Sequence, residues 1–335
     1  MAAFPPSPPF HRESSSSPFP PLILSPLPLA LAFERSFFDS LARPMTNNKM
    51  IFLSRLGSSI ALWAVALYII FAGFEIGFFL LIGTTGMMGL WEFYGMLDHK
   101  KLPNFKIVGM LAGAVLITGS FYYFRAFSVA ESYDFEVAVL LFLVLTVFAR
   151  QMFQKTRDPS PLETMAYTLF GLIYVLWLFN FMTKIVFVTP RIGGVVTGQF
   201  YVLYLIVVTK FSDMGAYITG SLIGRHLLVP HISPKKTWEG FFGALVFSTL
   251  GSYAMLALLS NHLPLITPLH AGVLGVLLGF AAIVGDLAES IIKRSTDMKD
   301  SGNMLPGIGG ALDLIDSLLF TAPLLFFYLR LVLHA

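Results

Sequence analysis

The chain has 335 residues, of which 56% are hydrophobic and only 12% are charged, and its formal net charge at pH 7 is +3. Soluble domains carry about 25% charged residues, so the composition excludes an ordinary soluble protein, and the small net charge gives no indication of nucleic-acid binding. The sequence contains no cysteine, which excludes disulfides, thiolate metal sites and cysteine nucleophiles.

Residues 1–49 differ in composition from the rest of the chain. They contain half of the twenty prolines and the run Ser14 to Ser17, so the segment is predicted to be disordered. Three interpretations stay open: an over-extended start ahead of Met45 or Met50, a dispensable tail, or a targeting segment. Prolines interrupt its apolar part, which weakens the targeting interpretation. The expected second unit, residues 50–335, is embedded in the membrane.

From residue 57 onward, apolar runs predict an all-α polytopic bundle of nine transmembrane helices. The turn at Ala72 and Gly73 is short, and the first two runs could form a single hairpin, so eight spans is the alternative. The nine predicted spans are 57–73, 75–97, 106–124, 135–150, 164–187, 198–222, 238–259, 268–292 and 312–333.

Basic residues gather in every second connection. The connections after spans two, four, six and eight hold twelve of the 22 basic residues, and an excess of Lys and Arg marks the cytoplasmic side. The amino terminus is therefore expected inside and, with nine spans, the carboxyl terminus outside. The last two of these connections are also rich in Gly, Ser and Asp, which predicts a site in the carboxyl-terminal half, at the cytoplasmic face. The twelve are Lys100, Lys101, Lys106, Arg150, Lys155, Arg157, Arg225, Lys235, Lys236, Lys293, Arg294 and Lys299.

The stretch "TKFSDMGAYITGSLIGRHLLVPHISPKKTWEG", residues 209–240, opens with a carboxylate inside an apolar span. An acid within a membrane helix indicates a functional site, although Asp213 could also simply pair with Lys210 one turn earlier. Small residues at every fourth position (Ala216, Gly220 and Gly224) are typical of close helix packing.

The end of this stretch, "SPKKTWEG", places two cations and two hydroxyls just before a helix. Lysines and a helix amino terminus bind phosphate, so Ser233, Lys235, Lys236 and Thr237 are candidate phosphate-binding residues. The alternative is a basic membrane anchor with Thr237 as a helix cap.

The richest cluster is "GDLAESIIKRSTDMKDSGNMLPGIGGALDLIDS", residues 285–317. Its acids, bases and glycine-rich turn are what a magnesium–nucleotide site requires, because Mg²⁺ prefers carboxylate and phosphate oxygens and glycine lets backbone N–H groups approach an anion. The alternative is a solvated interfacial loop of balanced charge. On one helical face lie Asp286, Glu289 and Lys293, and Arg294 lies beside Ser290, one turn apart. The candidates that follow are Lys299, Asp300, Gly307, Gly309, Gly310, Asp313 and Asp316.

Together these clusters resemble phosphatidate cytidylyltransferase, the CDP-diacylglycerol synthase family, over residues 50–335. "SPKKTWEG" resembles a second block of that family, and Asp213 with Ala216 and Tyr217 a third. Two positions depart from its pattern: Ile308 replaces a histidine and Leu314 an arginine. The main signature is carried by Ser290, Lys293, Arg294, Lys299, Asp300, Gly302, Pro306, Gly307, Gly309, Gly310, Asp313 and Asp316.

The resemblance implies a reaction between CTP and phosphatidate that gives CDP-diacylglycerol and pyrophosphate. It further implies Mg²⁺, with a second cation as an option, held by Asp286, Asp313 and Asp316, with Asp300 nearby. Phosphates would be held by Lys235, Lys236, Lys293 and Arg294. The expected partners are CTP, phosphatidate or a related lipid phosphate, and the bilayer of the cell inner membrane; a homodimer is an open option, and nucleic acid is not expected.

Two other functions are weighed against this one. A cytidylyltransferase acting on another lipid phosphate would have much the same sequence. A transporter could use Asp213 as a proton relay, but the charges cluster near one face, and the two halves show no paired broken spans. A CDP-alcohol phosphatidyltransferase would need an Asp-Gly-x-x-Ala-Arg block, which the sequence lacks.

Overall fold

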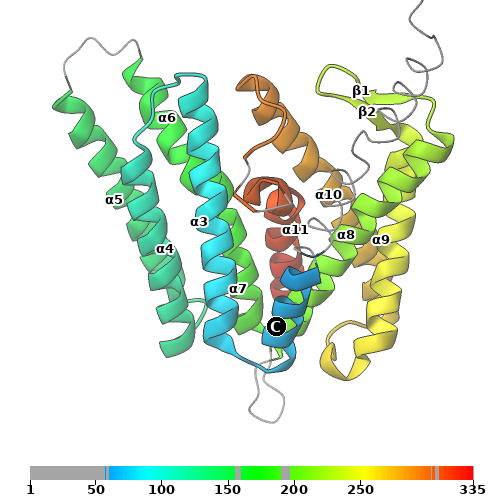
Figure 1. The fold of residues 1–335 in the computed structure, drawn as a ribbon. Helices are drawn as coiled ribbons and strands as arrows, with labels where there is room; N and C mark the ends of the chain where they lie inside the picture. The colour runs from blue at the N-terminus through cyan, green and yellow to red at the C-terminus, as the bar shows by residue number, and fades with distance from the viewer. Residues whose placement is uncertain are drawn as a thin grey trace, which may run out of the picture. The chain divides into compact units, whose positions relative to one another are not determined.

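The computed structural model describes residues 57, 60–154, 160–189, 197–302, 304–305 and 309–334. The predicted disordered segment 1–49 lies outside these residues. The described part is almost entirely helical, which confirms the predicted fold class (Figure 1). A helix at Ile60–Phe71 precedes the labelled elements, which are α3 (Glu75–His99), α4 (Lys106–Ala126), α5 (Ser132–Met152), α6 (Pro161–Gly171), η1 (Leu172–Trp177), α7 (Leu178–Val188), α8 (Gly198–Ile223), β1 (Leu227–Val229), β2 (Ser233–Thr237), α9 (Trp238–Leu259), η2 (Ser260–His262), α10 (Pro268–Ser295) and α11 (Ala311–Leu331).

Within the described residues, eight helical segments are long and apolar enough to cross a membrane, which agrees with the eight-span alternative. They correspond to the last eight predicted spans. The predicted first span is represented by the shorter helix Ile60–Phe71. The predicted span 164–187 is one continuous segment, Pro161–Val188, whose middle turn η1 is a π-helix.

Several helices begin where the sequence supplies a cap. The hydroxyl of Ser160 accepts from the N–H of Glu163 at 3.4 Å, and Pro161 occupies the first turn of α6. Thr267 caps α10 in the same way, followed by Pro268. A hydroxyl satisfies one of the free N–H groups at a helix start, and proline costs nothing there because its missing N–H has no partner in the helix.

Helices α8 and α9 pack closely through small residues. A Cβ added to Gly240 would lie 2.9 Å from the carbonyl oxygen of Ala216, and one on Gly220 would lie 3.7 Å from the Cα of Gly240. No larger side chain fits at Gly240 without moving the backbone of α8. The packing role predicted for the small residues of α8 is therefore confirmed.

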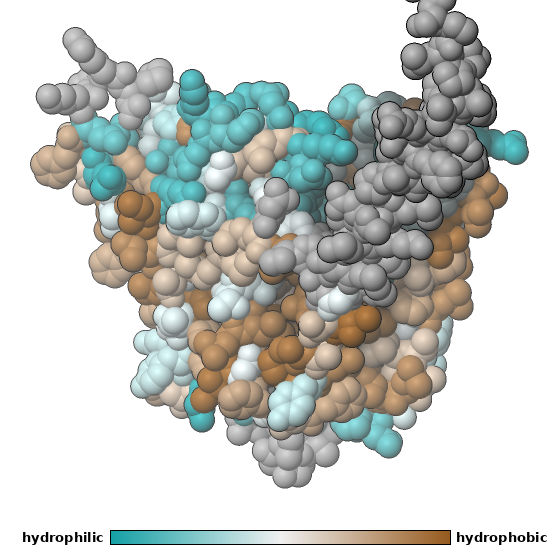
Figure 2. Space-filling view, in the orientation of Figure 1, coloured by the Kyte–Doolittle hydropathy of each residue, from teal (hydrophilic) through white to brown (hydrophobic). Residues whose placement is uncertain are grey.

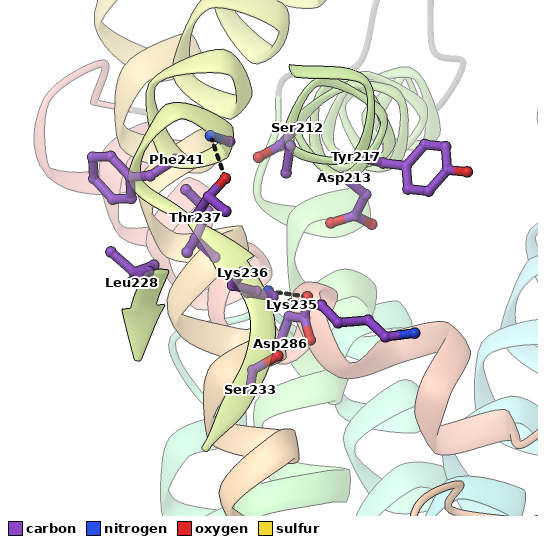
Figure 3. A pocket seen from close by; sticks show the side chains of 13 residues that line it. Ser212, Asp213, Tyr217, Leu228, Ser233, Lys235, Lys236, Thr237, Phe241 and Asp286 are labelled. Atoms are coloured by element: carbon purple, nitrogen blue, oxygen red, sulfur yellow. Dashed lines mark hydrogen bonds and ion pairs between the residues drawn. The ribbon is translucent and has the colours of Figure 1, made fainter. Parts of the chain in front are cut away.

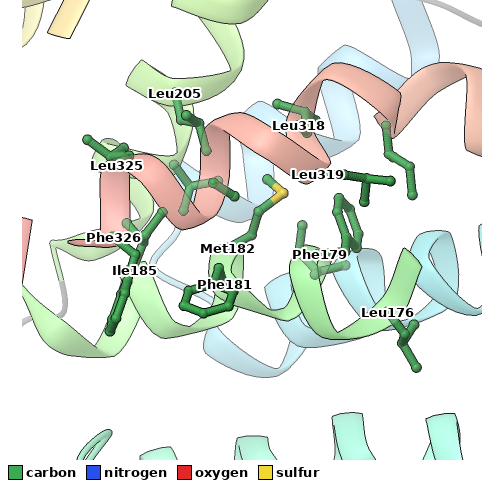
Figure 4. Packing of buried hydrophobic residues seen from close by; sticks show 14 of the residues in the cluster. Leu176, Phe179, Phe181, Met182, Ile185, Leu205, Leu318, Leu319, Leu325 and Phe326 are labelled. Atoms are coloured by element: carbon green, nitrogen blue, oxygen red, sulfur yellow. The ribbon is translucent and has the colours of Figure 1, made fainter. Parts of the chain in front are cut away.

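The apolar interior is centred on α7 and α11, which pack against each other (Figure 4). Phe181 and Phe326 meet edge to face, with ring centroids 5.2 Å apart, a favoured aromatic geometry. Leu319 and Leu325 are fully buried beside them. This contact fixes the position of α11, which carries Asp313 and Asp316 at its amino-terminal end.

A second, smaller interior contact is ionic. Lys184 Nζ lies 2.7 Å from Glu136 Oε2, and their side chains are 0% and 2% exposed. Trp177 Nε1 also donates to Glu136, at 2.9 Å. A buried ion pair persists only when its remaining hydrogen-bonding groups are satisfied, and the indole on the π-helix contributes to this.

Polar and apolar surfaces are separated along the bundle axis. Hydrophilic residues gather at the upper end, and apolar side chains cover the band below it (Figure 2). The α3–α4 connection, the β1–β2 hairpin and the carboxyl end of α10 lie at that upper end, whereas the α4–α5 and α9–α10 connections lie at the opposite one (Figure 1). The predicted basic connections thus share one end, apart from Lys155 and Arg157, which lie outside the described residues.

Candidate active site

A short hairpin places the "SPKKTWEG" residues. Strand β2 pairs antiparallel with β1 between α8 and α9, and the Thr237 hydroxyl accepts from the N–H of Gly240 at 3.1 Å. Thr237 is therefore the cap of α9, as the structural alternative predicted. It also lines a polar cavity of about 260 Å³, whose other predicted residues are Asp213, Ser233, Lys235, Lys236 and Asp286.

Charged side chains from three elements meet at this cavity (Figure 3). Lys236 reaches from β2 to Asp286 on α10 and forms an ion pair with it. Asp213 lies on α8, where its Oδ2 is 3.2 Å from Lys210 Nζ and its Oδ1 accepts from the Ser317 hydroxyl at 3.5 Å. The Asp213–Lys210 pair that the sequence suggested as an alternative is present, and it does not remove Asp213 from the cavity.

A second charged group links α10 to α11. Lys293 Nζ lies 2.9 Å from Asp313 Oδ1 and also pairs with Glu289 one turn earlier on α10. Asp313 in addition accepts the N–H groups of Ser301, at 3.2 Å, and Gly310, at 3.3 Å. Asp313 therefore holds the α10–α11 connection closed while its other face remains partly exposed.

Glu92, from the amino-terminal half, supports the same connection. It is 4% exposed and accepts from the backbone N–H of Leu312 at 2.9 Å, the N–H of Met304 at 3.4 Å and the Ser301 hydroxyl at 3.4 Å. One carboxylate on α3 thus fixes both ends of the loop. Sequence reasoning placed the whole site in the carboxyl-terminal half and missed Glu92, although an acid inside an apolar span was the available signal.

The glycine-rich turn is partly described. Gly309 has a φ of +118°, a conformation that favours glycine, and exchanges two 3.0 Å backbone hydrogen bonds with Leu305. The N–H of Gly310 donates to Asp313. In this structure both described N–H groups thus bond within the protein. Gly307 and Ile308 lie outside the described residues.

Four further predicted residues are not part of the lining of the polar cavity. Lys299 and Asp300 are exposed in the α10–α11 connection, outside the lining of the polar cavity. Arg294 Nε donates to the carbonyl oxygen of Ile232 at 3.4 Å, which ties α10 to the turn of the hairpin. Asp316 is 7% exposed and accepts the N–H of Ser317 at 2.5 Å.

The predicted metal ligands are near one another but do not form a preformed site. Among the described residues, no three Asp, Glu, His or Cys side chains converge closely enough to hold a metal ion. Asp316 is nevertheless close enough to Asp286, Asp213 and Glu289 for electrostatic repulsion. The metal assignment to Asp286, Asp313 and Asp316 therefore stays a prediction.

The charge balance suits a divalent cation. Five carboxylates from α8, α10 and α11 lie in this region, and four of them pair with Lys210, Lys236 or Lys293. With Lys235, which also lines the cavity, the acids exceed the lysines by one negative charge. Glu289 Oε1 is moreover a buried oxygen with no hydrogen-bond partner. Unpaired acids this close are costly in a membrane interior, and oxygen ligands are those that Mg²⁺ takes. The donor chemistry therefore suits a magnesium ion, whereas the described residues show no converged set of ligands.

Comparisons with known proteins identify the family of the chain. A family model described as "Cytidylyltransferase family" matches residues 53–332. A phosphatidate cytidylyltransferase of Bacillus subtilis (strain 168) is 34% identical over 268 residues, which are 80% of this chain and 93% of that protein. The phosphatidate cytidylyltransferase of Staphylococcus haemolyticus (strain JCSC1435) is 44% identical over 128 residues, 38% of this chain and 48% of the relative. That of Mycobacterium bovis (strain ATCC BAA-935 / AF2122/97) is 36% identical over 167 residues, 49% of this chain and 51% of the relative. This membrane-embedded chain belongs to the cytidylyltransferase family.

Proposed function

We propose that this enzyme transfers the cytidylyl group of CTP to phosphatidate and releases pyrophosphate. The observation that carries the proposal is the polar cavity at the hairpin end of the bundle, where Lys236 of β2 pairs with Asp286 of α10 and where Lys235 and Asp213 line the same space. The name of the Bacillus subtilis relative, which aligns over 93% of its length, supplies the substrate pair.

In the reaction, one phosphoanhydride bond forms and another breaks. A phosphate oxygen of the lipid attacks the α-phosphorus of CTP, the new P–O–P bond forms, and the bond from the α-phosphorus to the pyrophosphate oxygen breaks. The attacking phosphate is already ionised near neutral pH, so little general-base help is needed. Positioning and neutralisation of charge should account for most of the acceleration.

The residues of the cavity have defined tasks in this scheme. Lys235 and Lys236 bind phosphate oxygens of CTP, and Asp286 holds Lys236 in place. Lys293, between Glu289 and Asp313, carries positive charge toward the same region. Because these groups come from packed helices and a short hairpin, their positions are set before substrate binds.

We propose that Asp286, Asp313 and Asp316 hold Mg²⁺, with the unpartnered Oε1 of Glu289 as a further oxygen. The ion, when bound, would neutralise the charge that develops on the phosphates. Asp286 would then have to share its carboxylate between Lys236 and the metal, and Asp313 would share its own with Lys293.

We propose a cytoplasmic orientation in the cell inner membrane. Excess Lys and Arg mark the cytoplasmic side, and the basic connections share one end of the bundle (Figure 1). The hairpin that lines the polar cavity lies at that end, where it would meet CTP from the cytoplasm.

The test is a transfer assay with purified protein in lipid nanodiscs. The protein is incubated with Mg²⁺, α-³²P-labelled CTP and phosphatidate, and labelled lipid is extracted into organic solvent. We expect a cytidine-containing lipid with phosphatidate and none with diacylglycerol, which lacks the nucleophile. Labelled product from a polyprenyl phosphate, but not from phosphatidate, would contradict the proposed substrate.

A further inference from the structure

A second pocket lies next to the polar cavity. It has a volume of about 330 Å³ and is lined by the helix Ile60–Phe71 and by α3, α7, α8 and α11. This volume lies in the lower part of the range of about 300–1,000 Å³ that is common for small-ligand pockets. Almost all of the described side chains that line it are apolar, and the one charged side chain among them is Lys210.

Lys210 connects the two spaces. Its Nζ lies 3.2 Å from Asp213, which lines the polar cavity, and 3.3 Å from the carbonyl oxygen of Leu314, which lines the apolar pocket. An ammonium group has three donors, and these two contacts use two of them. The side chain of Lys210 is 33% exposed and lines the apolar pocket, so its third donor remains for a ligand there.

A lysine ammonium beside an apolar pocket suits a ligand that has an anionic headgroup and an apolar tail. A lipid with a phosphate headgroup would place its charge at Lys210 and one acyl chain in the apolar pocket. The acyl chain would leave the hydrocarbon of the membrane for an equally apolar pocket in the protein. The pocket would therefore select lipids by shape and would add little hydrophobic driving force. Lys210 would contribute the preference for a charged headgroup.

Leu314 marks the border between Lys210 and the apolar pocket. Its side chain lines the pocket, and its carbonyl oxygen lies 3.3 Å from Lys210 Nζ. A cation on α8 thus lies directly beside an apolar lining residue of α11.

We infer that Lys210 binds the phosphate of the lipid substrate and that the apolar pocket beside it receives an acyl chain. The inference rests on the proposed function, which identifies the lipid substrate as phosphatidate. Asp213 orients Lys210, and the lysines of β2 remain available for the nucleotide. Lys210 thus determines the selection of the lipid, not of CTP.

The first experiment separates the two substrates kinetically. In nanodiscs, Lys210→Met should raise the KM for phosphatidate about 10- to 100-fold, the typical effect of losing one hydrogen bond from a charged group. The KM for CTP should change by less than about threefold, and Lys210→Arg should keep most of the affinity for phosphatidate. Leu314→Arg in the Lys210→Met background should restore part of it. Lys106→Met, which removes a lysine paired with Asp98 at 3.3 Å, is the matched control and should leave both values unchanged.

The second experiment tests the pocket without turnover. Ala66→Phe fills part of the pocket lining, and Val65→Phe adds the same ring at a neighbouring exposed position. Binding of fluorescent long-chain phosphatidate to protein in detergent should weaken at least about tenfold with Ala66→Phe and little with Val65→Phe. Wild type should prefer phosphatidate to diacylglycerol, and Lys210→Met should lose this preference.

The outcomes distinguish the inference from the proposed function. Wild type that binds phosphatidate through Lys210 but makes no cytidine lipid would contradict the function and leave the binding site standing. An active wild type whose Lys210→Met variant keeps its KM for phosphatidate and its headgroup preference would overturn the inference. A fall in kcat alone, with both KM values unchanged, would overturn it as well.

Discussion

Lys293 on α10 is 2.9 Å from Asp313 on α11, and the same ammonium pairs with Glu289 on its own helix. One cation therefore neutralises two acids from two helices. Glu289 is 1% exposed, so it depends on this lysine more than the partly exposed Asp313 does. Removing the lysine would leave two carboxylates facing each other in a partly desolvated region.

Lys293→Met should accordingly reduce kcat by about 10²- to 10³-fold, the usual effect of losing one preorganised charge at a reacting group. The affinity for Mg²⁺ should rise or stay the same, because the acids lose their competing cation. Mg²⁺ titrations of activity in nanodiscs would measure both quantities. A variant with normal kcat would show that Lys293 only holds the helices together.

Asp286→Asn and Asp313→Asn should both abolish turnover, for different reasons. Asp286 lines the cavity and pairs with Lys236, so its loss should leave the fold intact. Asp313 also accepts two backbone N–H groups of the α10–α11 connection, so its loss should loosen this segment. Limited proteolysis near residue 300 would detect the difference between the two variants. Near-normal rates in both variants at limiting Mg²⁺ would contradict the proposal that Asp286 and Asp313 hold the metal.

Gly309→Ala tests the turn. The φ of Gly309 is +118°, a backbone strain that costs about 1–3 kcal/mol for a residue with a side chain. We expect at least a tenfold loss of activity, because a shifted turn also moves Asp313. Gly95→Ala is the matched control, since a Cβ there meets nothing within 4 Å, and it should be neutral. Ile308→His should change the rate much less than Gly309→Ala; a large gain would indicate that the site needs the histidine of the resembled family.

Breaking the Glu136–Lys184 pair should lower the stability of the protein and leave the active site unchanged. Lys184→Met leaves a buried carboxylate without its cation, which typically costs about 3–5 kcal/mol. The double variant Glu136→Leu with Lys184→Met should recover much of this stability. Thermal unfolding in detergent measures the effect, and kcat of the folded fraction should be unchanged. Equal stability of the single variant and wild type would contradict the buried pair.

Helix positions followed from the sequence because hydrophobic runs of membrane length have few alternatives. The span from Trp238 and the span from Pro268 begin within one residue of the prediction. The cap at Thr237 and the small-residue contact between α8 and α9 were also predictable, since both depend on local spacing.

Contacts between distant helices were not predictable in this way. Asp313 and Asp316 are three residues apart and share one face of α11, yet Asp313 meets Lys293, whereas Asp316 is buried beside Ser317. Spacing gives the face of a helix, but the partner depends on how neighbouring helices pack. The same limit explains why the partners of Glu92 could not be predicted and why Lys210 was considered only as a partner of Asp213.

The bonds of Glu92 also constrain biogenesis. Its partner Leu312 is 220 residues further along the chain, so during synthesis α3 enters the membrane long before the loop that satisfies its carboxylate exists. Until α11 arrives, the acid lacks these backbone donors and has to remain hydrated or protonated, since a bare charge is costly in lipid. Insertion of the last helix therefore completes the site and at the same time satisfies a carboxylate that nascent chains containing α3 but not α11 leave without these donors.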